Sequence, residues 1–228
     1  MIKVTETKYF KEYQQSIGRH IDEWIHHYDL REQKIEFDYS TRSSAVYSSN
    51  IEGNTVDLNS YMNQKLANRK IKPTKEIEEI DNLVTAYELA QTNPINEEIF
   101  LKCHAIFSKT LLIKSRRGNY RSEKVGVFNE RGLVYLAVEP EYVKEIMKDF
   151  FQGIKILLDS NLSIEKVFYH ASLMHLIFVH IHPFMDGNGR GARLVEKWFI
   201  SQKLGKQYWK IPSEKYYWDH REDYYANI

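Results

Sequence analysis

The sequence has very little cysteine and no excess of charge of one sign. Cys103 is the only cysteine among 228 residues, so the chain cannot form an internal disulfide. Such cysteine usage agrees with a reducing compartment, and we expect a cytoplasmic protein whose single thiol lies in the core. The 32 basic and 31 acidic side chains give a net charge of +1, which provides no broad electrostatic surface for nucleic acid or for an anionic membrane.

Long apolar runs are also missing. No stretch approaches the ~18 apolar residues that a membrane-spanning helix needs, and the N-terminal MIKVTETKYFKEY is too polar for a signal peptide. The one local basic cluster, Lys114, Arg116 and Arg117, is interpreted as a solvated loop. We therefore expect neither a membrane nor a nucleic acid among the partners of this chain. A hydrophobic content of 43% is enough for the core of one large domain.

Most of the sequence has the residue spacing of helices. Helices are expected near residues 8–29, 31–52, 75–92, 96–110, 139–159, 163–182, 188–204 and 213–226. The exception is 123–138, where two short β-like runs, Val125–Phe128 and Leu133–Val138, flank a turn that ends at Gly132 and predict a hairpin. Because a lone hairpin is marginal in water, it must pack on the helices. The sequence thus predicts an all-α fold with one small β-hairpin.

Two parts of unequal size are expected along the chain. Residues 1–39 are interpreted as an N-terminal helical arm, and residues 40–228 as the main domain. Trp24 and the apolar spacing around it indicate that the arm packs on the core or on a second copy of the chain, so a homodimer is one expectation. The sequence ends inside a helical pattern, which suggests truncation of a longer C-terminal part.

The stretch HPFMDGNGRGAR, from His182 to Arg193, holds three of the ten glycines of the chain. Pro183 disfavours helix at His182, and a new apolar face begins at Leu194. The glycine-rich stretch is therefore a tight loop that leads into the N-terminus of a helix. Glycines allow close approach of the backbone to a ligand, and successive N–H groups at a helix N-terminus bind anions.

The charged side chains of this loop predict a site for several phosphates. Arg190 and Arg193 are three residues apart and share one face of the first helical turns, where two guanidinium groups suit a polyphosphate. Asp186 would repel phosphate unless a hard cation such as Mg²⁺ lies between them. The imidazole of His182, at the entrance of the loop, could take a proton from an attacking hydroxyl.

Other interpretations of the loop fit less well. An EF-hand that starts at Asp186 would need a glutamate at its twelfth position, where Lys197 stands, and a Walker loop would need Gly-Lys-Ser/Thr. His180 and His182 could form half of a zinc site, but no further ligand spacing supports one. The remaining alternative is a glycine-rich connector whose histidine and arginines only cap helices.

The residues His182-Pro-Phe-Met-Asp-Gly-Asn-Gly-Arg-Gly-Ala-Arg193 resemble the complete signature of Fic-domain proteins. The resemblance extends over about residues 40–228 and includes Gly118-Asn-Tyr-Arg121, which is similar to the segment before the flap of that family, and the hairpin, which is similar to the flap. It implies a mainly α-helical Fic fold. It also implies transfer of AMP from ATP to a Ser, Thr or Tyr hydroxyl of a target protein, with Mg²⁺ and release of pyrophosphate. The target is unknown, and self-modification is one expectation.

The resemblance also implies roles for individual residues. His182 would be the general base, Asp186 would bind Mg²⁺, and Arg193 would reach the γ-phosphate. Gly187, Asn188 and Gly189 would form the anion hole around the α- and β-phosphates, and Arg190 would hold the nucleotide and the geometry of the motif. Phe184 would pack inward. The flap, near 123–138, would clamp an extended target segment by main-chain pairing along Val125, Gly126, Val127, Leu133, Val134 and Tyr135.

A second stretch, SSNIEGN, places Glu52 directly before Gly53, where a helix is expected to end. A carboxylate there faces the negative end of the helix dipole, at a cost of about 0.3–1 kcal/mol. The spacing from Ser48 to Glu52 resembles the inhibitory motif of Fic proteins, in the subgroup with an N-terminal inhibitory helix, here about 41–53. The resemblance implies that Glu52 pairs with Arg193 and lets ATP bind only in an unproductive pose. We further expect that Glu52 can orient a water molecule for removal of AMP.

Two rival functions stay open at this point. One is a non-enzymatic regulatory module that binds nucleotide or peptide on the same fold. The other is a different transfer, of phosphate or phosphocholine. The intact set of His182, Asp186 and Arg193 favours an enzyme.

Overall fold

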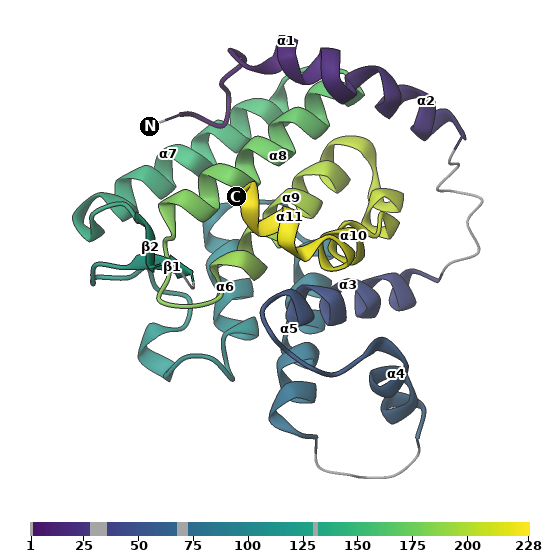
Figure 1. The fold of residues 1–228 in the computed structure, drawn as a ribbon, viewed down its shortest axis with the longest axis vertical. Coiled ribbons are helices and arrows are strands. Elements are labelled where there is room, and N and C mark those ends of the chain that lie inside the picture. The colour runs from purple at the N-terminus through teal and green to yellow at the C-terminus, as the bar shows by residue number, and fades with distance from the viewer. Residues whose placement is uncertain (1, 28–35, 68–72, 130–131) are drawn as a thin grey trace.

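In the computed structural model, residues 2–27, 36–67, 73–129 and 132–228 are described. Figure 1 shows helices gathered around α8 and α9, with a two-stranded hairpin at one edge. The helices are α1 (Phe10–Tyr13), α2 (Arg19–His27), α3 (Phe37–Ile51), α4 (Leu58–Leu66), α5 (Lys75–Thr92), α6 (Glu97–Phe107), α7 (Pro140–Asp159), α8 (Ile164–Ile181), α9 (Asn188–Leu204), α10 (Ser213–Asp219) and α11 (Arg221–Ala226); the strands are β1 (Gly126–Asn129) and β2 (Gly132–Leu136). A π-helical turn joins α1 to α2 over Gln14–Gly18, and short 3-10 turns occur at Lys114–Arg116 and Lys206–Lys210. The expected all-α fold with one small hairpin is confirmed.

The core lies between α8, α9 and the helices that surround them. Phe178, Leu194 and Trp198 are fully buried, and burial of each such side chain stabilises the fold by about 1.5–3 kcal/mol. The ring of Phe100, from α6, contacts Phe178 edge to face with ring centroids 5.3 Å apart. Cys103 is buried in the same core, as its spacing predicts. This packing fixes the end of α8 relative to the start of α9, where the glycine-rich loop lies.

Polar caps explain where several helices begin. The side chain of Asn96 accepts a hydrogen bond from the N–H of Ile99, and Ser163 caps α8 in the same way. The cap of α4 is Asp57, whose carboxylate accepts from the N–H of Ser60. Helix α4 was not predicted from the sequence, because Tyr61 is its only buried residue and the segment has no apolar periodicity.

Two expected helices are shorter or more broken than their patterns suggest. The helix expected over 31–52 begins at Phe37 among the described residues, and residues 28–35 lie outside them. The pattern over 213–226 forms two helices, because the backbone at His220 (φ −120°, ψ 41°) leaves the helical region. The resulting corner directs α11 back toward the end of α3.

The N-terminal arm packs on the core at its first residues. Val4 is 3% exposed, and its carbonyl accepts a hydrogen bond from Nδ1 of His170 at 2.8 Å. A Cβ atom at Gly153 of α7 would lie 2.4 Å from the Val4 side chain, so the close contact needs a glycine. Within the described part of the chain, no helix combines the length and the apolar character required to cross a bilayer.

The hairpin pairs in antiparallel register and lies against α8. Gly126 is opposite Leu136 and Asn129 is opposite Gly132, with an irregularity between Val127 and Phe128. The strands therefore cover slightly different residues from the expected runs, and Val125 precedes β1, although its carbonyl accepts from the N–H of Ala137 at 3.0 Å. The turn residues 130–131 lie outside the described residues.

Candidate active site

The loop between α8 and α9 begins with a left-handed residue. His182 has φ 51° and ψ 58° and is the only non-glycine residue with positive φ in the described part of the chain. This conformation is costly for a residue with a side chain and persists only where its surroundings enforce it. Arg121, which precedes the hairpin, stabilises this left-handed conformation of His182. Its Nε donates to the carbonyl of His182 at 2.7 Å, and its backbone N–H donates to the carbonyl of Pro183 at 2.9 Å.

The contacts of the His182 ring indicate which nitrogen carries the proton. Nδ1 lies 3.2 Å from the carbonyl of Val179, and because a carbonyl only accepts, Nδ1 is the protonated nitrogen. Nε2 then keeps its lone pair. Burial is the largest influence on this imidazole and lowers its pKa below the ordinary 6.5, so the ring is a neutral base at pH 7. The geometry suits the predicted role of proton acceptor.

Asn188 and Phe184 close the loop on itself. The amide of Asn188 accepts from the N–H of Phe184 and donates to its carbonyl, both at 2.9 Å. Phe184 is fully buried, as expected, and stacks on His104 with ring centroids 3.5 Å apart. The side chain of Asn188 is therefore occupied within the protein. Only its backbone N–H is available for the predicted anion hole.

The first backbone N–H groups of α9 lie at the end of the glycine-rich loop and are available as hydrogen-bond donors. Gly187 is the N-cap with φ 84°, and the first N–H groups of the helix, at Asn188, Gly189 and Arg190, have no intrahelical acceptor. Together with the helix dipole they favour an anion. An anion is in fact present: a Cβ atom at Gly189 would lie 2.2 Å from Oε1 of Glu52. The carboxylate of Glu52 thus lies directly against the predicted anion hole.

Glu52 also pairs with Arg193, as the sequence analysis expects. Nη2 of Arg193 donates to Oε1 of Glu52 at 2.7 Å; the arginine side chain is 1% exposed and the glutamate side chain 25%. Ser48 holds the same guanidinium, because its hydroxyl accepts from Nε and its carbonyl accepts from Nη2, both at 2.9 Å. The structure therefore brings Ser48, Glu52 and Arg193 together across 145 residues of sequence.

Electrostatics keep Glu52 ionised in this position. Burial alone would raise the pKa of its carboxyl group, but the positive charges of Arg193 and Arg190 outweigh it, and the pKa is lowered. Arg221 adds to this effect, and its Nε donates to the carbonyl of Ile51 at 2.9 Å. Arg221 therefore places a cation at the C-terminus of α3, which offsets the unfavourable position of Glu52 there. No motif in the sequence predicted this role of Arg221.

Arg190 was expected to hold the nucleotide, but its guanidinium forms an ion pair with Glu79. Its Nη2 lies 2.5 Å from Oε1 of Glu79 on α5, and both side chains are largely buried. The guanidinium groups of Arg190 and Arg193 therefore bond different helices and do not act as one pair. The geometry fits the second part of the predicted role of Arg190, which is to hold the motif in shape.

Asp186 is exposed at the start of the loop and fits a magnesium ligand. Its Oδ1 accepts from the N–H of Gly187 at 2.6 Å, and the exposed carboxylate can still offer an oxygen to a cation. No group of three or more His, Cys, Asp or Glu side chains suited to a metal occurs in the part of the chain that the structure describes. A cation at Asp186 would therefore have one protein carboxylate plus phosphate and water oxygens, which is a common environment for Mg²⁺ and a poor one for zinc.

The sequence did not predict the positioning roles of two residues, His104 and Arg121, although Arg121 ends the segment that resembles the one before the flap of the family. His104 accepts from the N–H of Gly118 at 2.9 Å through Nδ1 and donates to the carbonyl of Asp186 at 3.1 Å through Nε2. Burial lowers its pKa to about 4, so it keeps this neutral form. Arg121 donates to the carbonyls of Glu123 and Val138, at the two ends of the hairpin, as well as to that of His182. These residues tie the loop to the segment before the hairpin and to the hairpin itself.

The hairpin residues predicted to dock a target lie beside the glycine-rich loop. The hydroxyl of Tyr135 donates to the carbonyl of Val179 at 2.8 Å, the same carbonyl that Nδ1 of His182 contacts, and its ring stacks on His180. Leu133 and Leu136 are 51% and 70% exposed on β2. Val125 and Gly126 are half-buried, while the side chains of Val127 and Val134 lie outside the described residues.

Comparisons with known proteins agree with the motif. The sequence profile of the Fic/DOC family matches residues 94–200. The chain is 35% identical over 94 residues to Protein adenylyltransferase fic-1 of Caenorhabditis elegans and 31% identical over 162 residues to Protein adenylyltransferase Fic of Nematostella vectensis. A solved structure of a Fic family protein from Desulfovibrio desulfuricans G20 has a TM-score of 0.76 and 26% identity, over 97% of this chain and 66% of that one.

The two adenylyltransferases are much longer than the segments that match. The alignments cover 41% and 66% of this chain but only 17% and 35% of those relatives. The matched region includes the whole of His182–Arg193. Residues 94–200, which include the loop motif, therefore match the Fic/DOC family, and they lie in a helical fold similar to that of a solved Fic family protein.

Proposed function

We propose that the protein transfers AMP from Mg·ATP to a hydroxyl group of a target protein and that Glu52 inhibits this reaction. The observation that carries the proposal is the carboxylate of Glu52, which lies at the N-terminus of α9 against Gly189 and bonded to Arg193. A site that holds a carboxylate between a helix N-terminus and a buried guanidinium is suited to a polyphosphate. The relatives named protein adenylyltransferases support the choice of AMP transfer.

Each residue of the loop has a separate role in the proposed reaction. The N–H groups of Asn188 and Gly189 bind phosphate oxygens, and Arg193 binds the γ-phosphate. The target hydroxyl oxygen attacks the α-phosphorus, its proton passes to Nε2 of His182, and the bond from the α-phosphorus to the bridging oxygen breaks to release pyrophosphate. Mg²⁺, when held by Asp186, neutralises charge on the phosphate oxygens.

Glu52 competes with the triphosphate for the same donors. While Nη2 of Arg193 bonds the glutamate, it cannot bind the γ-phosphate, and the carboxylate repels phosphate from Gly189. ATP that enters the site must then take a pose in which the α-phosphorus is not in line with an incoming hydroxyl. The same carboxylate could also direct a water molecule for the reverse removal of AMP.

Mass spectrometry of the intact protein tests the reaction type. The chain with Glu52→Gly is incubated with Mg·ATP, or with CDP-choline, alone and with a protein extract that supplies targets. An added AMP supports the proposal, whereas an added phosphate or phosphocholine would assign a different transfer to the same fold. If no protein is modified under any condition, the non-enzymatic interpretation gains support.

The pH dependence of the reaction should follow His182. Its lowered pKa means that the neutral, basic form persists above a midpoint that lies below 6.5, and activity is lost as the pH falls through that midpoint. We expect kcat/KM of the Glu52→Gly variant, which reports groups of the free enzyme, to be flat from pH 7 to about 6.5 and to fall at lower pH. An acidic limb with its midpoint well above 6.5 would contradict the assignment.

Replacing Asp186 with asparagine should remove the effect of Mg²⁺ on nucleotide affinity. The asparagine keeps an oxygen for the N–H of Gly187, so the loop is preserved while the charge is lost. We expect calorimetric titration to show ATP binding weakened about 10-fold in Mg²⁺, equal to about 1.4 kcal/mol, and unchanged in EDTA. Asp149→Asn, at an exposed position on α7, is the matched control. Equal affinity of the two variants in Mg²⁺ would remove Asp186 from the metal site.

A further inference from the structure

The hydroxyl of Tyr224, on α11, joins Arg193 to a buried histidine. Nη1 of Arg193 donates to the Tyr224 oxygen at 3.0 Å, and that hydroxyl lies 2.9 Å from Nε2 of His175. Tyr224 is 8% exposed and His175 is 4% exposed. Arg193 is thus held on two sides by residues of the protein that carry no charge, Ser48 on α3 and Tyr224 on α11.

The hydrogen bonds that link Arg193, Tyr224 and His175 continue to Glu196. A guanidinium only donates, so the Tyr224 oxygen accepts from Arg193, which leaves the hydroxyl proton available to Nε2 of His175 when that nitrogen carries no proton. Nδ1 of His175 then carries a proton, which it donates to Oε2 of Glu196 at 2.6 Å. Oε1 of Glu196 accepts from the hydroxyl of Tyr217 at 2.7 Å. Burial raises the pKa of Tyr224 to about 12, so its hydroxyl stays protonated.

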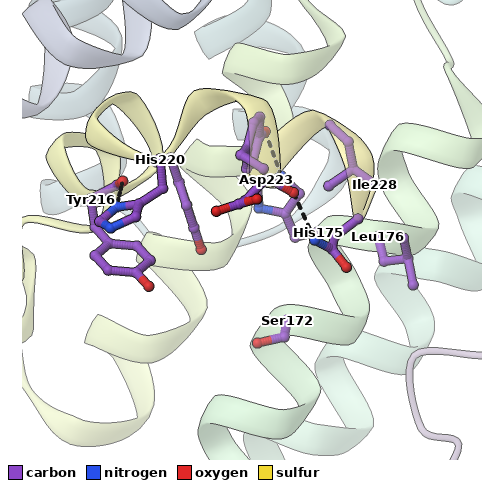
Figure 2. Close-up of a pocket in the computed structure, with 10 residues that line it drawn as sticks. Ser172, His175, Leu176, Tyr216, His220, Asp223 and Ile228 are labelled. Carbon is purple, nitrogen blue, oxygen red and sulfur yellow. Dashed lines mark hydrogen bonds between the residues drawn. The ribbon is translucent and has the colours of Figure 1, made fainter.

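Helix α11 is fixed well enough to act as a support. The helix before it, α10, is anchored by a buried ion pair between Lys197 and Glu214, with Nζ and Oε2 2.9 Å apart. The hydroxyl of Tyr225 donates to the carbonyl of Ile51 at 2.9 Å. A pocket of about 390 Å³ lies beside this cluster, and its lining includes His175 and Tyr224. Figure 2 shows Ser172 and His175 of α8 and Asp223 of α11 around it.

We propose that Tyr224 is a positioning residue that holds the guanidinium of Arg193 in the orientation needed to bind the γ-phosphate. The inference rests on the proposed function, in which ATP displaces Glu52 from Nη2. After that displacement, Ser48 still accepts from Nε and Nη2, and Tyr224 still accepts from Nη1. The N–H of Nη2 that Glu52 has left can then bind a phosphate oxygen while the guanidinium keeps its orientation. Pre-organisation of this kind increases affinity for the triphosphate.

Tyr224→Phe isolates the contribution of the hydroxyl. The phenylalanine keeps the ring, which contacts Tyr217 with centroids 4.9 Å apart, so the packing of α11 is preserved. Tyr225→Phe is the matched control, because it removes a neighbouring hydroxyl of the same helix that does not bond Arg193. Both changes are made in the Glu52→Gly background, where Arg193 has no carboxylate partner from α3.

Calorimetric titration with Mg·ATP and Mg·ADP tests the inference, since ADP lacks the γ-phosphate. Loss of a hydrogen bond to a charged group is expected to weaken ATP binding about 10-fold, with ADP binding unchanged. In the transfer reaction, KM for ATP should rise by a similar factor while kcat changes little. Tyr225→Phe should keep the affinity for both nucleotides.

Arg193→Ala in the same background separates failure of the inference from failure of the proposed function. If Arg193→Ala loses the preference for ATP over ADP and Tyr224→Phe keeps it, Arg193 needs no support from α11 and the inference is wrong. If Arg193→Ala also keeps the preference, Arg193 does not bind the γ-phosphate, and the proposed function loses that contact. An equal loss of ATP and ADP affinity in Tyr224→Phe would indicate a general structural effect and would overturn the inference.

Discussion

Replacing Glu52 with glycine is expected to raise the rate of AMP transfer about 100-fold. The change removes a charge-assisted hydrogen bond to Arg193, worth about 1.5–3 kcal/mol, and removes a carboxylate from the N-terminus of α9. Both donors then become available to the triphosphate. The measurement is incorporation of label from ATP carrying a labelled α-phosphate, into the protein itself and into a protein extract.

Two comparisons sharpen this result. Glu52→Gln keeps an oxygen that can accept from Arg193 but removes the charge, so an intermediate rate is expected. Label at the γ-phosphate should not be incorporated.

The Glu52→Gly variant should also unfold at lower temperature without nucleotide, because Arg193 is left buried without its ionic partner, and Mg·ATP should restore part of the loss. A rate equal to that of the unmodified chain would show that Glu52 does not inhibit.

Replacing His182 is expected to reduce transfer by about 10³-fold while nucleotide binding survives. General-base catalysis contributes about 10²–10⁴-fold, and the donors of α9 that bind phosphate do not depend on the imidazole. His182→Asn is preferable to alanine, since asparagine tolerates the left-handed backbone of this position. Initial rates in the Glu52→Gly background, with ATP affinity measured in parallel, provide the test.

The neighbouring His180 is the control for this experiment. It lies two residues earlier on α8, is exposed, and stacks on Tyr135 of the hairpin. His180→Ala should leave kcat nearly unchanged, because the ring takes no part in proton transfer. A large activity in His182→Asn, or an equal loss in both variants, would remove His182 from the role of base.

The loop and the contact with Glu52 could be predicted because their signals are local or belong to a known motif. Pro183 ends α8 and the glycines start α9, and both effects follow from the backbone preferences of a few adjacent residues. The Ser48–Glu52 spacing places both side chains on one face of α3, and the structure confirms that this face meets Arg193. The roles proposed for these residues in catalysis and inhibition stay predictions.

The supports of the site could not be predicted, since they depend on tertiary contacts without local periodicity. Arg121 bonds carbonyls of His182, Glu123 and Val138, and a backbone carbonyl leaves no mark in the sequence. His104 occupies a helical position that also fits a core residue. Tyr224 is one of several aromatic residues near the C-terminus, and its partners lie 31 and 49 residues away. Helix α4 was missed for a similar reason, because it buries too little to show a pattern.

A structure of the Glu52→Gly variant with Mg²⁺ and a non-hydrolysable ATP analogue is the most direct test of the whole account. We expect the phosphates to lie against the N–H groups of Asn188 and Gly189, with the γ-phosphate bonded to Arg193 and the α-phosphate facing Nε2 of His182. A nucleotide bound elsewhere, or phosphates at the loop with the imidazole turned away from them, would contradict it.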